Sequence, residues 1–172
     1  MRLMRIIVSD TSCMIHLEKA TLLNAVLTLP YVFVMPDTLF EDEWLGLAES
    51  DKKMLFDNGL EIRELPGAAV TRAAVHFNQY KRLTLNDCFA LALAQDIDDS
   101  ILLTGDSALR TVAERNGIEV HGVLWVTDEL ESHGIVSPRK LYDALRLLHD
   151  DPLVFLPDDK VQRRIRHLAR LF

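Results

Sequence analysis

This 172-residue sequence has few cysteines, no long apolar run and no signal peptide. The two cysteines, Cys13 and Cys88, lie in apolar surroundings and form no CxxC or disulfide-like pattern, which is typical of small core residues in a reducing compartment. No apolar run approaches the roughly 18 residues that a membrane span needs, and the residues before Asp10 are too few for a signal peptide. We therefore expect a cytoplasmic protein without a membrane segment.

Phosphate loops, histidine clusters and an excess of positive charge are also absent. There is no glycine-rich phosphate loop, which argues against P-loop and dinucleotide enzymes, and the six histidines show no metal-ligand spacing. The net charge of −7 argues mildly against a protein that simply coats nucleic acid. However, residues 160–172 contain five arginines and lysines and no acid. This tail also carries an apolar stripe, so we expect it to be a docked helix whose cations could add phosphate contacts.

What is present is an alternation of apolar strands and helices, in a chain that is 49% hydrophobic and long enough for one domain. Buried or edge strands are predicted at 6–9, 31–35, 60–65, 101–103 and 118–120, with helices between them. This spacing predicts a three-layer α/β/α fold with a central parallel sheet and right-handed crossovers. The domain is expected to span residues 1–134, followed by a C-terminal helical extension at 135–172. Within the helix at 68–82, we expect Val70, Ala74 and Phe77 to share one side.

Three aspartates stand where strands end or helices begin. Asp10 and Asp106 each follow an apolar strand and precede a helix, so each could act only as a helix N-cap. Asp87 lies in Thr84-Leu85-Asn86-Asp87, which resembles a capping box with Asp in place of Glu or Gln. None of the three indicates a functional site when taken alone.

Glu43 is distinguished by its phase in the predicted helix at 39–47. Glu41 completes a capping-box spacing, and Asp42 falls on the solvent-facing side. At about 100° per residue, Glu43 falls between Leu39 and Leu47 in the middle of the apolar stripe. A bare carboxylate costs several kcal/mol to bury there, so we expect Glu43 to be paired, protonated or bound to a cation. A buried ion pair with an arginine is the structural alternative.

The four acids are more informative together. Strand ends and helix starts of the same topological direction meet at one edge of a parallel sheet, so Asp10, Glu43, Asp87 and Asp106 are expected to converge. When four carboxylates lie close together, either their pKa values rise or a positive charge binds nearby. No lysine or arginine is adjacent to any of the four in sequence. An all-oxygen site suits Mg²⁺ or Mn²⁺ rather than Zn²⁺.

Four stretches, taken in order and with their spacing, resemble the PIN domain (PilT N-terminal) family. They are Val8–Ser12, Pro36 with the acidic helix after it, Leu85–Ala94, and Leu103–Arg110. The resemblance covers about residues 5–134, including the segment Gly117–Gly122. It implies a parallel sheet flanked by helices and an acidic metal pocket.

By this resemblance, Asp10 is the first metal ligand, Asp87 the third and Asp106 the fourth. The family spacing leaves the second ligand open between Asp42 and Glu43, and the helical phase favours Glu43. Hydroxyl groups that support the pocket in relatives correspond here to Thr11, Ser12 and Thr104.

The resemblance implies a Mg²⁺- or Mn²⁺-dependent endoribonuclease, many of whose relatives are VapC-type toxins of toxin–antitoxin pairs. RNA is then the substrate, an antitoxin protein is a possible partner, and a homodimer is plausible. The alternative is a catalytically inactive PIN-like binding or scaffold protein whose acids only cap helices. A phosphoacceptor domain is disfavoured, because it would need a lysine where the chain has His121 and a second aspartate just after Asp10.

Overall fold

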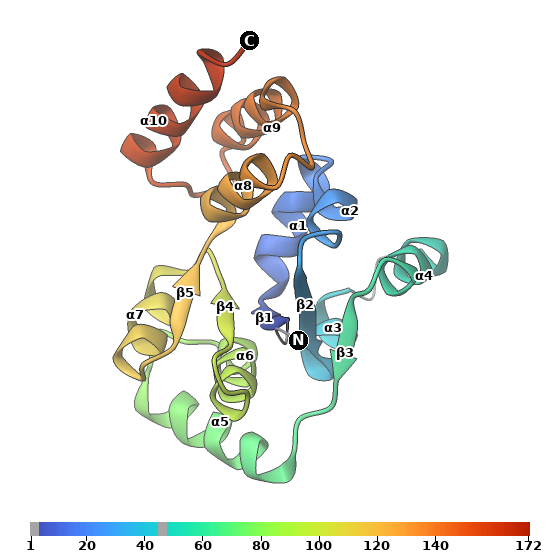
Figure 1. The fold of residues 1–172 in the computed structure, drawn as a ribbon. Coiled ribbons are helices and arrows are strands. Elements are labelled where there is room, and N and C mark those ends of the chain that lie inside the picture. The colour runs from blue at the N-terminus through green and yellow to red at the C-terminus, as the bar shows by residue number, and fades with distance from the viewer. Residues whose placement is uncertain (1–3, 45–47) are drawn as a thin grey trace.

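The computed structural model of the chain describes residues 4–44 and 48–172. Within these residues, five parallel strands form one sheet in the order β3-β2-β1-β4-β5 (Figure 1). The strands are β1 (Arg5–Ser9), β2 (Tyr31–Pro36), β3 (Glu61–Arg63), β4 (Ile101–Leu103) and β5 (Glu119–His121). In the central strand β1, Ile7 and Val8 are fully buried, as in parallel sheets with both faces covered. The predicted parallel sheet is confirmed.

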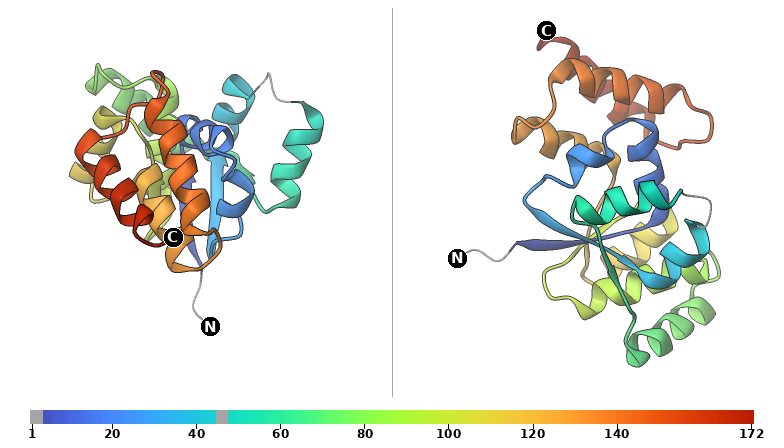
Figure 2. Two further views of the ribbon diagram at one scale, coloured as in Figure 1. Left: turned by 90° about the horizontal axis from the view of Figure 1, so that it is seen from above. Right: turned by 90° about the vertical axis from the view of Figure 1, so that its right-hand side faces the viewer.

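Helices cover both faces of this sheet, which gives the predicted three-layer α/β/α fold (Figure 2). They are α1 (Thr11–Lys19), α2 (Leu23–Val26), α3 (Asp37–Glu43), α4 (Glu49–Asp57), α5 (Gly67–Gln79), α6 (Leu85–Asp96), α7 (Ser107–Arg115), α8 (Val123–Ser132), α9 (Pro138–Asp150) and α10 (Asp158–Ala169). The apolar helix α6 packs on β1, β2 and β4, while α5 and α7 pack against α6. Helices α1 and α2 both contact α8.

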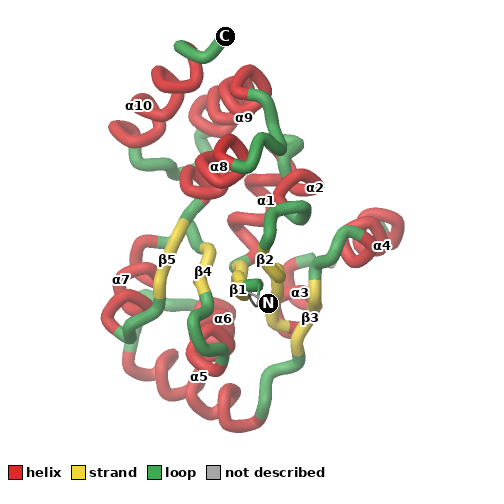
Figure 3. Tube along the Cα trace, viewed as in Figure 1, coloured by secondary structure: helices red, strands yellow, loops and turns green. Residues whose placement is uncertain are grey.

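The segment that was expected to be one helix at 39–47 differs in the structure. Helix α3 begins at Asp37, with Pro36 as its N-cap, and it ends at Glu43. The expected capping box between residues 38 and 41 is therefore wrong, because Thr38 is already inside the helix. The expected continuation through residues 45–47 lies outside the described residues. Helix α4 follows and stands to the side of the sheet near β3, which is an edge strand as predicted (Figure 3).

The buried face of α5 also differs from the predicted one. Ala69, Ala73 and His76 are buried on this helix, whereas Val70 and Phe77 are 43% and 44% exposed. The helix packs closely on α6, and the small side chain of alanine permits that approach better than valine or phenylalanine does. The expectation based on the larger apolar residues was therefore wrong by one residue in phase.

The C-terminal helices α8, α9 and α10 lie together at one end of the molecule (Figure 1). Val161, Ile165 and Leu168 of α10 are buried, so the tail is docked on its own chain, although Phe172 at the end of the expected stripe is 55% exposed. Arg164 also faces inward and forms ion pairs with acids of α8. No helix in the described part of the chain is long and apolar enough to cross a membrane.

Candidate active site

Asp10 lies at the end of the central strand and is only 6% exposed. Its Oδ1 accepts hydrogen bonds from the backbone amide of Cys13 at 2.9 Å and from the hydroxyl of Ser12 at 3.0 Å. Its Oδ2 accepts a hydrogen bond from the hydroxyl of Thr104, which follows the neighbouring strand β4. Asp10 is therefore both the N-cap of α1 and a carboxylate held in place from β4.

Asp106 is brought beside this strand end by the same threonine. The backbone amide of Asp106 donates to Thr104 Oγ1 at 3.0 Å, and Asp106 Oδ1 accepts from the amide of Leu109 at 2.7 Å. The second carboxylate oxygen, Oδ2, accepts no hydrogen bond from the described residues. Asp106 thus caps α7 with one oxygen, and the other remains available.

Asp87 forms the capping box that its sequence resembles. The Thr84 amide donates to Asp87 Oδ2 at 2.7 Å, and the Asp87 amide donates to Thr84 Oγ1 at 3.1 Å. The side chain is half-buried, and its Oδ1 accepts no hydrogen bond within the described ranges. As with Asp106, a capping role leaves one carboxylate oxygen free.

Glu43 reaches the same edge by a different route from the one expected. It is exposed at the last position of α3, and Trp44 occupies the buried position next to it at 2% exposure. The expected burial of Glu43 in the apolar stripe is wrong, because the helix ends before that stripe could continue. Instead, Glu43 Oε1 accepts a hydrogen bond of 2.7 Å from Nδ2 of Asn86, the residue before Asp87.

Electrostatic interactions connect the four acids in pairs. Burial raises the pKa of Asp10, and the charge of Asp87 raises it further, against the hydrogen bonds from Thr104, Cys13 and Ser12. Burial also raises the pKa of Asp87, with added contributions from the charges of Asp106 and Glu43. Among the described residues, none of the four carboxylates forms an ion pair with a lysine or arginine. The negative charge at this edge is thus left without a counter-ion from the described chain.

The donor atoms suit a hard divalent cation in their chemistry, because they are carboxylate oxygens. Asp87, Asp106 and Glu43 each keep an oxygen that accepts no hydrogen bond from the described residues. Their side chains are not gathered around one point, however: in residues 4–44 and 48–172, no group of three or more His, Cys, Asp or Glu residues is placed to hold a metal ion. The residues therefore fit a metal by donor type and by location at one sheet edge, without forming a closed coordination sphere.

The three predicted supporting hydroxyls differ in their contacts. Ser12 and Thr104 both donate to Asp10, whereas the buried Thr11 hydroxyl has no partner in the described part of the chain. Asn86, which holds Glu43, was not singled out by sequence analysis. The signal available for it was a polar amide next to a candidate ligand at the start of an otherwise apolar helix.

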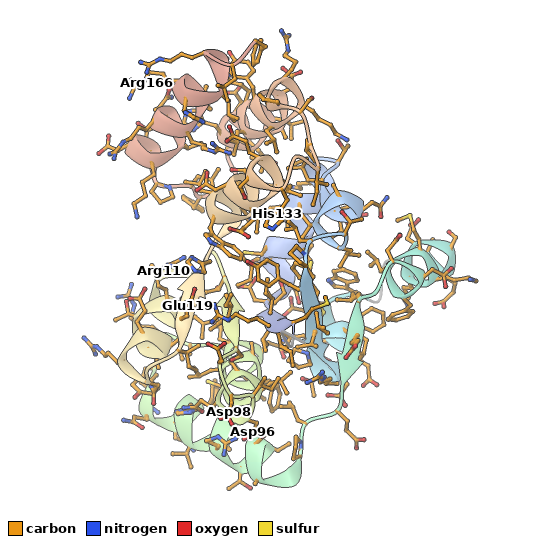
Figure 4. All side chains as sticks on the ribbon, in the orientation of Figure 1. Asp96, Asp98, Arg110, Glu119, His133 and Arg166 are labelled. Atoms are coloured by element: carbon orange, nitrogen blue, oxygen red, sulfur yellow. The ribbon has the colours of Figure 1, made fainter. Side chains whose placement is uncertain are left out.

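A groove of about 900 Å³ opens beside the acidic edge. Thr104 and Asp106 are among the residues that line it, and so is Arg110 of α7, on the side that faces α8 (Figure 4). The Arg110 guanidinium donates to the carbonyl oxygens of Val120 and Thr104, at 3.1 Å and 3.4 Å. Arg110 is therefore held against the ends of β4 and β5 rather than paired with the four acids.

The fold and this edge together define a three-layer α/β protein with acidic side chains at the carboxyl ends of its parallel strands. A family model for the PIN domain matches residues 6–170. The chain belongs to the PIN domain family. The comparison with curated proteins found no match.

Proposed function

We propose that this protein is a metal-dependent endoribonuclease that hydrolyses RNA phosphodiester bonds. PIN domains are generally nucleases, and the match covers most of the chain. The observation that supports the proposal is that Asp10, Glu43, Asp87 and Asp106 lie at one edge of the sheet, on four separate segments, and that the charge of Asp87 interacts with each of the others. An acidic site repels a phosphate unless a cation intervenes, so this charge supports metal-assisted chemistry.

The four acids would hold the cation, which is Mg²⁺ or Mn²⁺ in this proposal. When bound, such an ion supplies a hydroxide-like nucleophile at neutral pH and neutralises charge on the phosphate. The chain itself does the positioning. Thr104 and Ser12 fix the Asp10 carboxylate, the capping bonds of Asp87 and Asp106 orient these two acids, and Asn86 holds Glu43 at the same edge.

The direct test is cleavage of a mixed-sequence RNA by wild type and by Asp106→Asn, purified in parallel, with Mg²⁺ or with EDTA. Asparagine is as good an N-cap as aspartate, so α7 keeps its cap while the site loses a carboxylate. We expect cleavage by the wild type with the metal only, and a large loss in the variant. Asp143→Asn, an exposed substitution on α9, is the matched control with full activity. Equal activity of Asp106→Asn would indicate a contaminating nuclease.

A catalytically inactive binding protein is the second candidate, and one observation favours it. Asp10, Asp87 and Asp106 each accept a hydrogen bond from a backbone amide at a helix start, so each has a structural role without any metal. In that case the Asp→Asn variants would keep both stability and partner binding, and no metal-dependent cleavage would be found. The cleavage assay therefore separates the two candidates.

The remaining parts of the proposal extend the family resemblance. We propose that the enzyme is the toxin of a toxin–antitoxin pair, that it acts in the cytoplasm as a homodimer, and that an antitoxin protein binds it. The division into a nuclease domain at 1–134 and an extension at 135–172 also stays a prediction. Co-purification with the product of the neighbouring reading frame and the mass of the isolated protein in solution would test the antitoxin and the dimer.

A further inference from the structure

The groove beside the acidic edge continues along the C-terminal helix. Residues 155–157, between α9 and α10, and Lys160 also line it. A second hollow of about 380 Å³ shares Leu124, Asp128 and Lys160 with it and adds Arg163 and His167 of α10. The two hollows therefore form one groove, called here the α8–α10 groove, which runs from Asp106 to the basic tail.

Phe155 is the most exposed large apolar side chain that lines this groove, at 86% exposure. Its neighbours Val154 and Leu156 pack against the core, so the backbone is anchored on both sides while the ring projects outward. Packing within the chain gives no reason for a phenylalanine at this position. A flat aromatic face held in this way is the kind of surface on which a nucleic-acid base stacks.

The charges along the groove change from the acidic edge to the tail. Glu114 lies 3.7 Å from Arg110 and Asp128 lies 2.8 Å from Arg164, so these acids are partly neutralised by neighbours. Lys160 and Arg163 are exposed and form no ion pair with any described residue. Four arginines or lysines and three acids line the groove, although the chain as a whole carries a net charge of −7. The groove thus has a small excess of basic side chains, and the two without an ion-pair partner among the described residues, Lys160 and Arg163, both lie on α10.

We propose that the α8–α10 groove binds single-stranded RNA next to the bond to be cleaved, with a base stacked on Phe155 and phosphates at Lys160 and Arg163. The choice of RNA rests on the proposed function, because the groove opens directly onto Asp106. The single-stranded form follows from Phe155, since bases in a duplex have their faces covered and cannot stack on a side chain. In this proposal the C-terminal segment contributes to substrate binding, and the acids at the sheet edge contribute to cleavage.

The test is equilibrium binding of a short, fluorescein-labelled single-stranded RNA of mixed sequence to the full chain, in EDTA so that no metal-dependent cleavage occurs. We expect Phe155→Ala to weaken binding roughly tenfold, because one base loses its stacking partner. We expect Lys160→Ala and Arg163→Ala each to reduce the slope of log affinity against log salt by about 0.7, the value for one phosphate contact on a single strand. Phe155→Ala should leave that slope unchanged.

Two matched controls come from the same segments. Leu153 is 75% exposed in the same connection as Phe155 but does not line the groove. Arg166 is exposed on α10 and points away from the body of the molecule (Figure 4). Leu153→Ala and Arg166→Ala should bind the RNA as the wild type does. The proposal would be overturned if Leu153→Ala weakened binding as much as Phe155→Ala, or Arg166→Ala as much as Lys160→Ala and Arg163→Ala. Unchanged binding in the Phe155, Lys160 and Arg163 variants would also overturn it, and a protein partner would then be the better candidate for the groove.

Cleavage with Mg²⁺ is measured separately, so the two proposals can fail independently. If the wild type cleaves RNA and the groove variants keep its affinity and KM, the groove proposal is wrong and the nuclease stands. If the groove variants lose affinity as expected but neither they nor the wild type cleave RNA, the groove proposal is supported and the nuclease proposal is wrong. Tight binding of a duplex of the same sequence through Phe155 would contradict the single-strand requirement.

Discussion

The hydroxyl of Thr104 donates a hydrogen bond to the buried carboxylate of Asp10 and joins the ends of two neighbouring strands. The strand register places Ser9 opposite Leu103, so the residues that follow each strand meet. The same hydroxyl oxygen accepts the backbone amide of Asp106. Thr104 therefore helps to position two candidate metal ligands, and we assign it a structural role in the site.

Replacing Thr104 with valine is the first test of this relationship. The change keeps the shape of the side chain but leaves Asp10 Oδ2 and the Asp106 amide without their partner, which should lower the free energy of unfolding by about 1–3 kcal/mol. Urea denaturation measures the loss, and RNA cleavage should fall with it.

Thr11→Val is the matched control for Thr104→Val. Thr11 is equally buried, but its hydroxyl has no partner among the described residues, so its removal should leave stability unchanged or raise it. If both valine variants lose the same stability, the threonine at the end of β4 has no special role in holding the acids.

A divalent cation should stabilise the folded protein if the acids bind it. Addition of Mg²⁺ or Mn²⁺ to EDTA-treated protein should raise the Tm, because an ion at a hundred times its Kd adds about 2.7 kcal/mol. Asp10→Asn keeps the N-cap of α1 and should lose most of this shift. The control is NaCl at matched ionic strength. An equal shift in wild type and variant would show that the cation acts on surface charge and not at Asp10.

The sheet and most helices could be predicted from the sequence because their signals are local. Apolar runs bounded by polar residues mark β1, β2 and β4, and Thr84 and Asp106 mark helix starts through their own capping bonds. The parallel order of the strands then brings Asp10 and Asp106 to one edge. Hydrophobic periodicity, capping residues and strand topology are enough to predict these features.

The details that failed depend on where a helix ends and on what packs against it. The expected burial of Glu43 assumed a helix that continues beyond Trp44, whereas α3 ends at Glu43. The face of α5 was assigned to the largest apolar side chains, whereas close packing on α6 selected Ala69 and Ala73. The Asn86–Glu43 hydrogen bond joins positions 43 residues apart, so no local pattern contains it.

The three consecutive acids at the end of α3 now provide an internal comparison. Glu41, Asp42 and Glu43 are all exposed, but within the described residues Glu43 alone among them accepts a hydrogen bond from α6, donated by Asn86. We expect Glu43→Gln to reduce RNA cleavage by at least tenfold, while Glu41→Gln and Asp42→Asn keep activity and stability close to the wild type. Loss of cleavage in Asp42→Asn instead would identify Asp42 as the second ligand.

Glu131 of α8 gives the last prediction, because Arg164 and His167 of α10 both bind it. Burial works to raise its pKa, but the hydrogen bonds from these two residues outweigh burial and lower the pKa below its ordinary value. A carboxylate of this kind stabilises the fold fully above its unfolded-state pKa, about 4.3, and the stabilisation is lost as the pH falls through the folded-state pKa. Glu131→Gln should therefore cost about 1 kcal/mol at neutral pH, and its difference from the wild type should shrink in acid. Urea denaturation at several pH values measures this, with Asp143→Asn, in an exposed pair with Arg139, as the control near zero throughout. A difference that stays constant with pH would show that charge on Glu131 does not hold α10 in place.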